Sequence, residues 1–293
     1  MSRRLTHLLS ALTMLAIFAS SLPSADARRR RRSCRKRDKM VKLHYTHGGQ
    51  VWIPRRISCG GTAPVIILLH GNNASLDKHP SLGGGRHLEK TVSKYVRAGW
   101  IWPVVLAEPI HHGTCSKNRG KLPPVFGWGF DFKKYKRKLT KLLRKHGIRV
   151  RSWSVMAHSG SGCCRGAGIF AAVKAFPRLF LYATSDTCYS SPYYADFIVK
   201  HFRRKRTRVV NTCRGAARYS FYKKYEKTFI GKRPQRCGRL DKTYYKYCRK
   251  RRGKRWYAYV TKFKTVKSHS QVFREVVKTL LFKFFRRKRR RRR

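Results

Sequence analysis

Acidic side chains are scarce in this sequence of 293 residues. It has 11 Asp plus Glu against 72 Lys plus Arg, which gives a formal net charge of +61. Such a chain attracts any polyanion nearby. Because carboxylates are so few, one that stands at the end of a predicted strand carries more weight as a catalytic candidate than it would in an ordinary protein.

A second long apolar run is absent after the N-terminal segment. That segment, "MSRRLTHLLSALTMLAIFASSLPSADA", has two early arginines, an apolar run from Leu8 to Phe18 and a small-x-small site at Ala25–Ala27. This pattern is typical of a signal peptide, and the apolar run is shorter than the roughly 20 residues that span a bilayer. We therefore expect cleavage after Ala27 and a secreted protein that is soluble or surface-associated.

The C-x-x-C spacing of zinc ribbons is also missing, which argues against a structural zinc site. The nine cysteines all follow Ala27, and their odd number leaves at least one thiol unpaired in a monomer. Export permits disulfides. Cys237 with Cys248 is the favoured local bridge, and Cys188 with Cys213 is a second, weaker pairing.

Signatures of helix-turn-helix, zinc-finger and RNA-binding modules are lacking, so no sequence-specific nucleic-acid binding is expected. The basic arm at 28–39 and the tail at 286–293 are too charged to bury and are interpreted as disordered. Their binding to a polyanion or an anionic surface would be non-specific and sensitive to salt. The aromatic side chains in "KRWYAYVTKF" are interpreted as part of an ordinary strand.

Strand and helix patterns alternate through the remaining chain, 40–285. A hairpin is predicted around His47–Gly49, and buried strands in "APVIILLH", "WPVVLAEP", "RVRSWSVMA", "RLFLYATS" and "TRVVNT". Amphipathic helical segments lie between them, and "SHSQVFREVVKTLLFKFF" forms a closing helix. This alternation predicts one α/β domain with a mostly parallel central sheet and helices on both faces.

The stretch "SVMAHSGSGCCRGAG" carries the main chemical signal. An apolar strand ends at Ser159, which Ala157 and Ser161 flank, and a small-residue segment follows. Small residues are needed where a strained strand-to-helix turn presents a serine. The pattern small-x-Ser-x-small resembles the nucleophile elbow of the α/β-hydrolase superfamily, although Ala157 and Ser161 replace the two glycines of G-x-S-x-G.

This resemblance implies the rest of a catalytic serine site. The dipeptide His70-Gly71 at the end of an early strand would open the loop that supplies one oxyanion-hole amide, from Asn72, and Gly160 would supply the other. The order serine, acid, histidine puts the general base near the C-terminus, where His269 is the only histidine beyond His201.

The triad acid has several candidates. Asp186 directly follows the strand "RLFLYATS" and is the preferred one, whereas "TRVVNTCRGAAR" contains no carboxylate. Its role would be to orient the imidazole and stabilise its charged form. Asp196 is the second candidate, and Glu226 and Asp241 are more remote.

Two functional hypotheses follow. The first is a secreted serine hydrolase, an esterase-like enzyme that cleaves an ester or related acyl bond of a small or polymeric substrate without metal or cofactor. The alternative is a catalytically inert cationic protein that binds polyanions on a hydrolase scaffold. A thiol mechanism through Cys163 or Cys164 is disfavoured, because both follow the elbow and do not stand at its corner.

Overall fold

The structure is a computed structural model. It describes residues 37–44, 49–58, 60–70, 82, 87–111, 129–162, 167–185, 197, 200–202, 207–214, 236–238, 244–252, 256–263 and 269–287. The predicted signal peptide, most of the basic arm and the last six residues lie outside this set. Residues from Asp38 onward belong to one compact unit.

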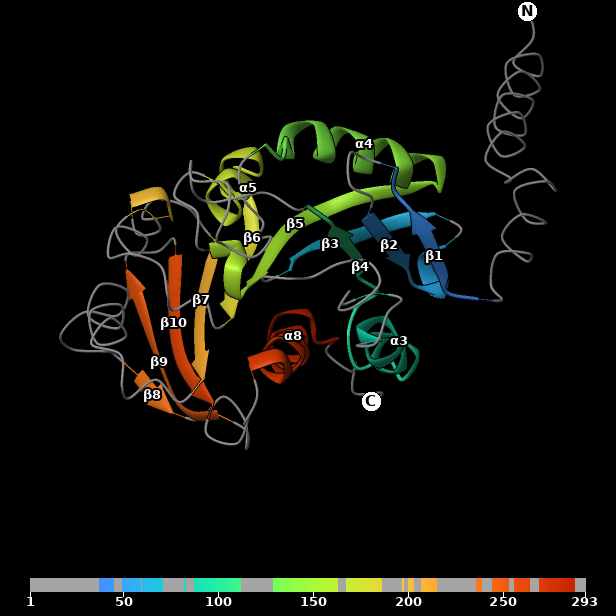
Figure 1. The fold of residues 1–293 in the computed structure, drawn as a ribbon. Coiled ribbons are helices and arrows are strands. Elements are labelled where there is room, and N and C mark those ends of the chain that lie inside the picture. Colours follow the sequence, from blue (N-terminus) through green and yellow to red (C-terminus); the bar gives the residue numbers. More distant parts are fainter. Residues whose placement is uncertain are drawn as a thin grey trace, which may run out of the picture. The chain divides into compact units, whose positions relative to one another are not determined.

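A mixed sheet forms the centre of this unit (Figure 1). Its strands are β1 (Lys39–Lys42), β2 (Gly49–Ile53), β3 (Gly61–Leu69), β4 (Val105–Pro109), β5 (Ile148–His158), β6 (Leu179–Ser185), β7 (Arg208–Arg214), β8 (Arg236–Gly238), β9 (Tyr244–Arg252) and β10 (Trp256–Phe263). Their order across the sheet is β1-β2-β4-β3-β5-β6-β7-β10-β9-β8.

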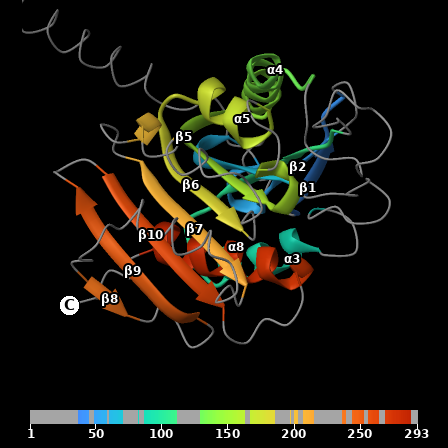
Figure 2. The same cartoon turned by 60° about the vertical axis from the view of Figure 1, so that its left-hand side comes forward.

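The middle of the sheet is parallel and its two edges are antiparallel. Strands β4, β3, β5, β6, β7 and β10 run parallel to their neighbours within this group. At one edge β1 and β2 form an antiparallel hairpin that joins β4, and at the other β9 and β8 continue from β10 (Figure 2). The carboxyl ends of the parallel strands therefore share one edge of the sheet, where ligands bind in folds of this kind.

Helices cover both faces of the sheet. The helices α4 (Phe132–Lys145) and α5 (Ile169–Ala175) lie on one face, and α3 (Leu88–Arg97) and α8 (His269–Phe285) on the other (Figure 1). Side chains of β3 alternate between two cores: Ile67 packs toward α4 and α5, and Ile66 toward α3 and α8. This two-sided burial explains why the central strands are continuous apolar runs.

Helix α4 shows how so basic a chain still folds. Asp131 caps its N-terminus by accepting a hydrogen bond from the Lys134 amide at 2.9 Å. The apolar stripe is buried and consists of Phe132, Tyr135, Leu139 and Leu143, while most of the lysines and arginines between them are exposed. The spacing of three or four residues gathers the apolar positions on one side. Charge is thus confined to the solvent face.

The sequence predictions agree with most of these elements. The hairpin, the five buried strands, the strand at β10 and the closing helix are confirmed. Two strands, β8 and β9, were not predicted, because the segment from 236 to 252 is rich in Lys and Arg and lacks an apolar alternation. The helix expected in "AARYSFYKKYEKTF" lies outside the described residues.

Truncation of Ile67 to Ala tests the two-layer core. Ile67 is fully buried in the middle of β3, so the change leaves a cavity and should lower the free energy of unfolding by about 2–5 kcal/mol. Thr62→Ala, at an exposed position of the same strand, is the matched control and should change it by less than about 0.5 kcal/mol. Denaturant unfolding of the two variants measures the difference. Equal stability losses would contradict the assigned core.

The register of β8 and β9 generates a prediction about a disulfide. Cys237 stands directly opposite Cys248 in this antiparallel pair, and opposed Cα atoms in such pairs are about 4.5–5.5 Å apart, inside the range that a disulfide bridges. We expect a Cys237–Cys248 bond in protein produced under oxidising conditions. Peptide mapping without reduction should recover the linked pair, and a Cys237→Ser variant should instead show free Cys248. Recovery of both thiols unpaired would refute the pairing.

Candidate active site

Ser159 stands where the central strand β5 ends and the chain turns sharply. It is the first residue of the short 3-10 helix η2 (Ser159–Gly162) and has a φ of 45°. A left-handed backbone is uncommon for a residue other than glycine and costs of the order of 1–3 kcal/mol. Among the described residues other than glycine, only His87 shares it. This is the strained strand-to-helix corner that the sequence predicted.

The flanking residues are as small as this corner requires. Ala157 and Ser161 are both fully buried, and the Ser161 hydroxyl donates a hydrogen bond to the His158 carbonyl at 2.8 Å. That hydrogen bond joins the residue before Ser159 to the second residue after it. The Ser161 side chain therefore occupies the position of the second glycine in the pattern G-x-S-x-G, and its hydroxyl is hydrogen-bonded within the turn.

Strand β3 brings the predicted oxyanion loop to the same corner. Leu69 is paired with Ala157 across the parallel β3–β5 register, so His70 follows beside the end of β5. The buried His70 ring accepts a hydrogen bond at Nε2 from the His111 amide, at 3.2 Å. Asn72 lies outside the described residues. Gly160 directly follows Ser159 within η2.

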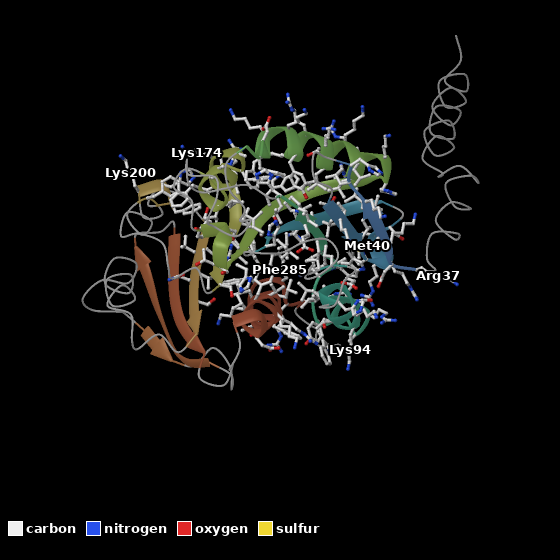
Figure 3. All side chains as sticks on the ribbon, viewed as in Figure 1. Arg37, Met40, Lys94, Lys174, Lys200 and Phe285 are labelled. Carbon is white, nitrogen blue, oxygen red and sulfur yellow. The ribbon has the colours of Figure 1, made fainter. Side chains whose placement is uncertain are left out.

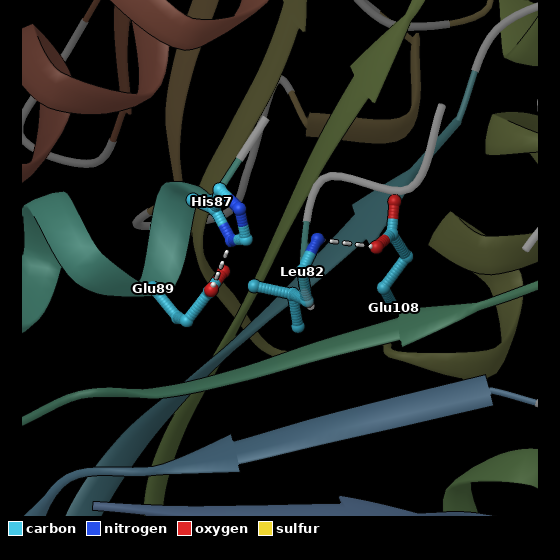
Figure 4. Close-up of polar contacts among 4 residues, drawn as sticks. All are labelled: Leu82, His87, Glu89 and Glu108. Atoms are coloured by element: carbon cyan, nitrogen blue, oxygen red, sulfur yellow. Dashed lines mark hydrogen bonds and ion pairs between the residues drawn. The ribbon is translucent and has the colours of Figure 1, made fainter. Parts of the chain in front are cut away.

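The far end of the same loop is attached to β4. The carboxylate of Glu108, which is 1% exposed, accepts a hydrogen bond at Oε2 from the Leu82 amide at 2.9 Å (Figure 4). Burial, and secondarily the charge of Glu108, raises the pKa of the Tyr135 hydroxyl well above its usual range. Together with the His70–His111 contact, this bond attaches His70 and Leu82, the described residues on either side of 71–81, to the carboxyl end of β4 and the residues just after it.

A second polar contact in the same view belongs to the start of α3. His87 Nδ1 lies 3.2 Å from Glu89 Oε1 (Figure 4), and His87 has the left-handed φ of 42° at the N-cap position. His87 is 46% exposed at its side chain. This pair stabilises the first turn of α3 and is separate from the elbow.

Helix α8 approaches the elbow with its first turns. The ring of Phe273 packs against the ring of His158, with centroids 5.2 Å apart. His269 is the first residue of α8 and precedes Phe273 by four residues, about one helical turn. The turn of α8 that follows His269 is therefore in contact with the residue before Ser159, although 110 positions separate His269 from Ser159 in the sequence.

The acid candidates lie outside the described residues. Asp186 directly follows Ser185, the last residue of β6, and Ser185 is paired with His158 of β5. Asp196, Glu226 and Asp241 also fall outside the described set, as do Cys163 and Cys164. In the chain, Asp186 thus comes directly after the residue that is paired with His158.

Two further observations concern the described residues alone. They contain no cluster of three His, Cys, Asp or Glu side chains arranged to hold a metal ion. None of their helices is long and apolar enough to cross a membrane.

Comparison with solved structures identifies the fold. A serine-to-alanine mutant of the feruloyl esterase module from Clostridium thermocellum, complexed with sinapinate, is 14% identical with a TM-score of 0.55, covering 85% of this chain and 88% of that chain. A ferulic acid esterase is 12% identical with a TM-score of 0.51, covering 85% and 98%. No protein-family model and no curated protein matches the sequence. The likeness confirms the α/β-hydrolase fold that the elbow and the alternation predicted.

Removal of the Ser161 hydroxyl tests the closed corner. Ser161→Ala deletes the donor to the His158 carbonyl in a fully buried turn, so the free energy of unfolding should fall by about 1–2 kcal/mol. Thr62→Ala serves again as the surface control. Denaturant unfolding of both variants measures the effect, and an unchanged stability of Ser161→Ala would show that the turn does not need this bond.

Proposed function

We propose that the chain is a serine hydrolase that cleaves an ester or related acyl bond through an acyl-enzyme. The observation that carries this proposal is Ser159, held with a positive φ at the carboxyl end of a central parallel strand. An α/β-hydrolase fold by itself hosts proteins with and without activity, so the argument has to come from the site. A buried polar residue in a strained conformation at this corner has no evident value for stability, and strain of this kind is typical of functional sites.

In the proposed mechanism the Ser159 hydroxyl attacks the acyl carbonyl carbon while its proton passes to His269. The C–O bond to the leaving alcohol then breaks, and the alcohol takes that proton from the imidazolium. Water, deprotonated by the same histidine, cleaves the acyl-enzyme and restores the serine. The amides of Asn72 and Gly160 stabilise the oxyanion that forms in each half-reaction, and loss of one such donor costs about 10²–10³ in rate.

The position of α8 supports His269 as the base. Phe273, one turn along the helix from His269, touches the residue that precedes Ser159, and this contact supports the assignment. His70 and Leu82, which stand on either side of the segment that contains Asn72, are both hydrogen-bonded to residues at or just after the carboxyl end of β4. This supports Asn72 as a donor, because it brings the chain on both sides of that segment to the edge of the sheet where β5 ends at Ser159.

Asp186 is proposed as the acid that orients His269. Its place after Ser185, at the carboxyl edge of the sheet and one strand away from β5, supports the assignment. Asp196, Glu226 and Asp241 are the alternatives to compare by mutation. An Asp→Asn change at the true acid leaves the shape intact and typically lowers kcat by about 10⁴.

The substrate is proposed to be an acyl ester, with secretion following cleavage after Ala27. The two solved structures named above are a feruloyl esterase module complexed with sinapinate and a ferulic acid esterase. Esters of aromatic acids therefore belong in the first substrate panel beside short aliphatic esters. A hydrolase of this class needs neither metal nor cofactor.

A fluorophosphonate probe tests the nucleophile directly. An activated Ser159 should form one adduct, which intact mass and peptide mapping locate, and Ser159→Ala should form none. Ser152→Ala, in the middle of the same strand, is the matched control and should be labelled as well as the unmodified protein. Ester turnover should vanish with the label, a loss of at least about 10³ in kcat.

A cooperative unfolding transition shows that the protein is folded. If such protein forms no adduct, the hydrolase proposal is refuted. Salt-sensitive binding of a polyanion without turnover would then favour the inert cationic protein on the same scaffold. An adduct on another residue would keep a hydrolase but reject this site.

A further inference from the structure

A short turn between α3 and β4 exposes two tryptophans. Among the described residues, the exposed large hydrophobic side chains are Met40, Trp100 and Trp102, at 41%, 43% and 45%. The two tryptophans flank Ile101, which is fully buried. Trp is enriched at interfaces, because its ring is apolar and its N–H can bind a polar partner.

Backbone contacts hold this turn against the end of α8. Trp102 donates its amide hydrogen to the Phe285 carbonyl at 2.8 Å, and Arg287 donates its own to the Trp100 carbonyl at 3.0 Å. Ile101 and Arg286 form an antiparallel bridge. The turn and the segment after α8 are therefore one small paired structure.

The exposed rings also rest on fixed neighbours. The Trp100 ring stacks on Tyr95, with centroids 5.7 Å apart and planes at 28°, and lies 6.0 Å from the Phe282 ring. The guanidinium of Arg287 lies 5.4 Å from the centroid of Trp102. Side chains that are already ordered lose little conformational entropy on binding, which favours a rigid contact surface.

Positive charge surrounds the two tryptophans. Exposed Lys94 and Arg97 occupy the last turn of α3 (Figure 3 labels Lys94), and Arg56 donates from Nη2 to the Arg97 carbonyl at 3.2 Å. Arg286 and Arg287 are exposed as well. In the sequence no acid occurs in 94–104 or 282–293, and the six residues that follow Arg287 are all Lys or Arg.

We propose that this aromatic–basic patch, formed by Trp100, Trp102, Arg97, Arg286 and Arg287, docks the protein on an anionic phospholipid bilayer. Indole rings favour the headgroup region, and basic residues near an anionic leaflet are attracted to it. The proposal does not rest on the hydrolase function.

A bilayer fits the patch better than single-stranded nucleic acid does. Nucleotides bind to such surfaces by stacking on open ring faces, yet one face of Trp100 is covered by Tyr95 and the Arg287 guanidinium lies over Trp102. Insertion between headgroups requires no open face, because the ring enters as an apolar body beside phosphates that pair with arginine.

Vesicle binding by the full secreted chain tests the patch. Flotation would compare phosphatidylcholine vesicles with an equal mixture of phosphatidylcholine and phosphatidylglycerol, near physiological ionic strength. The Trp100→Ala/Trp102→Ala variant keeps every positive charge and should bind the anionic vesicles about tenfold or more weakly than the unmodified protein. Met40→Ala removes the third exposed hydrophobic side chain, on β1 (Figure 3), and should bind within about twofold.

Brominated lipids provide a second measurement in case the double variant folds poorly. Tryptophan fluorescence of the bound, unmodified protein should be quenched by lipids brominated high in the acyl chain, and the conservative Trp100→Phe/Trp102→Phe variant should lose that quenching. Equal vesicle affinity of the unmodified and Ala variants would overturn the proposal, because charge alone would then suffice. So would binding without quenching, or a poly(U) affinity that falls with the Ala variant while vesicle affinity does not.

Discussion

The left-handed backbone of Ser159 is the constraint on which the candidate site depends. A residue with a Cβ at φ 45° is unfavourable by itself, so the surrounding structure has to enforce it. Strand β5 does so from the middle of six parallel strands, with β3 and β6 paired on its two sides. On the other side of the corner, the Ser161 hydroxyl holds the His158 carbonyl. The paired central strands and this hydrogen bond therefore hold Ser159 in its strained conformation.

A net charge of +61 is compatible with this fold because charge and core are separated by periodicity. Each helix that covers the sheet has an apolar face, and the strand side chains alternate between two cores. Exposed Lys and Arg repel one another, but in water that repulsion is screened within about 10 Å at moderate salt. The buried apolar surface therefore dominates the stability, and the positive charge is available for partners outside.

Helix α8 connects the two functional regions inferred here. Its first turns contact the elbow through Phe273, and its last residue accepts the bond that holds the tryptophan turn. The helix has 17 residues, which corresponds to about 25 Å. The same element thus contributes the proposed general base at one end and supports the proposed membrane patch at the other, and Phe285 remains buried between the patch and the sheet.

The sequence by itself determined the alternation of elements, the strand-ending Ser159 and the order of the expected catalytic groups, because hydrophobic period and small-residue turns are local properties of the chain. It missed β8 and β9, whose strand character comes from the pairing of β9 with β10 and of β8 with β9, and not from their own composition. Only the tertiary structure decided that Leu69 pairs with Ala157, that Phe273 of α8 packs on His158 and that the turn with Trp100 and Trp102 is paired with the end of α8. Each of these depends on contacts between segments far apart in the chain, and a local pattern carries no information about which distant segment will supply the partner.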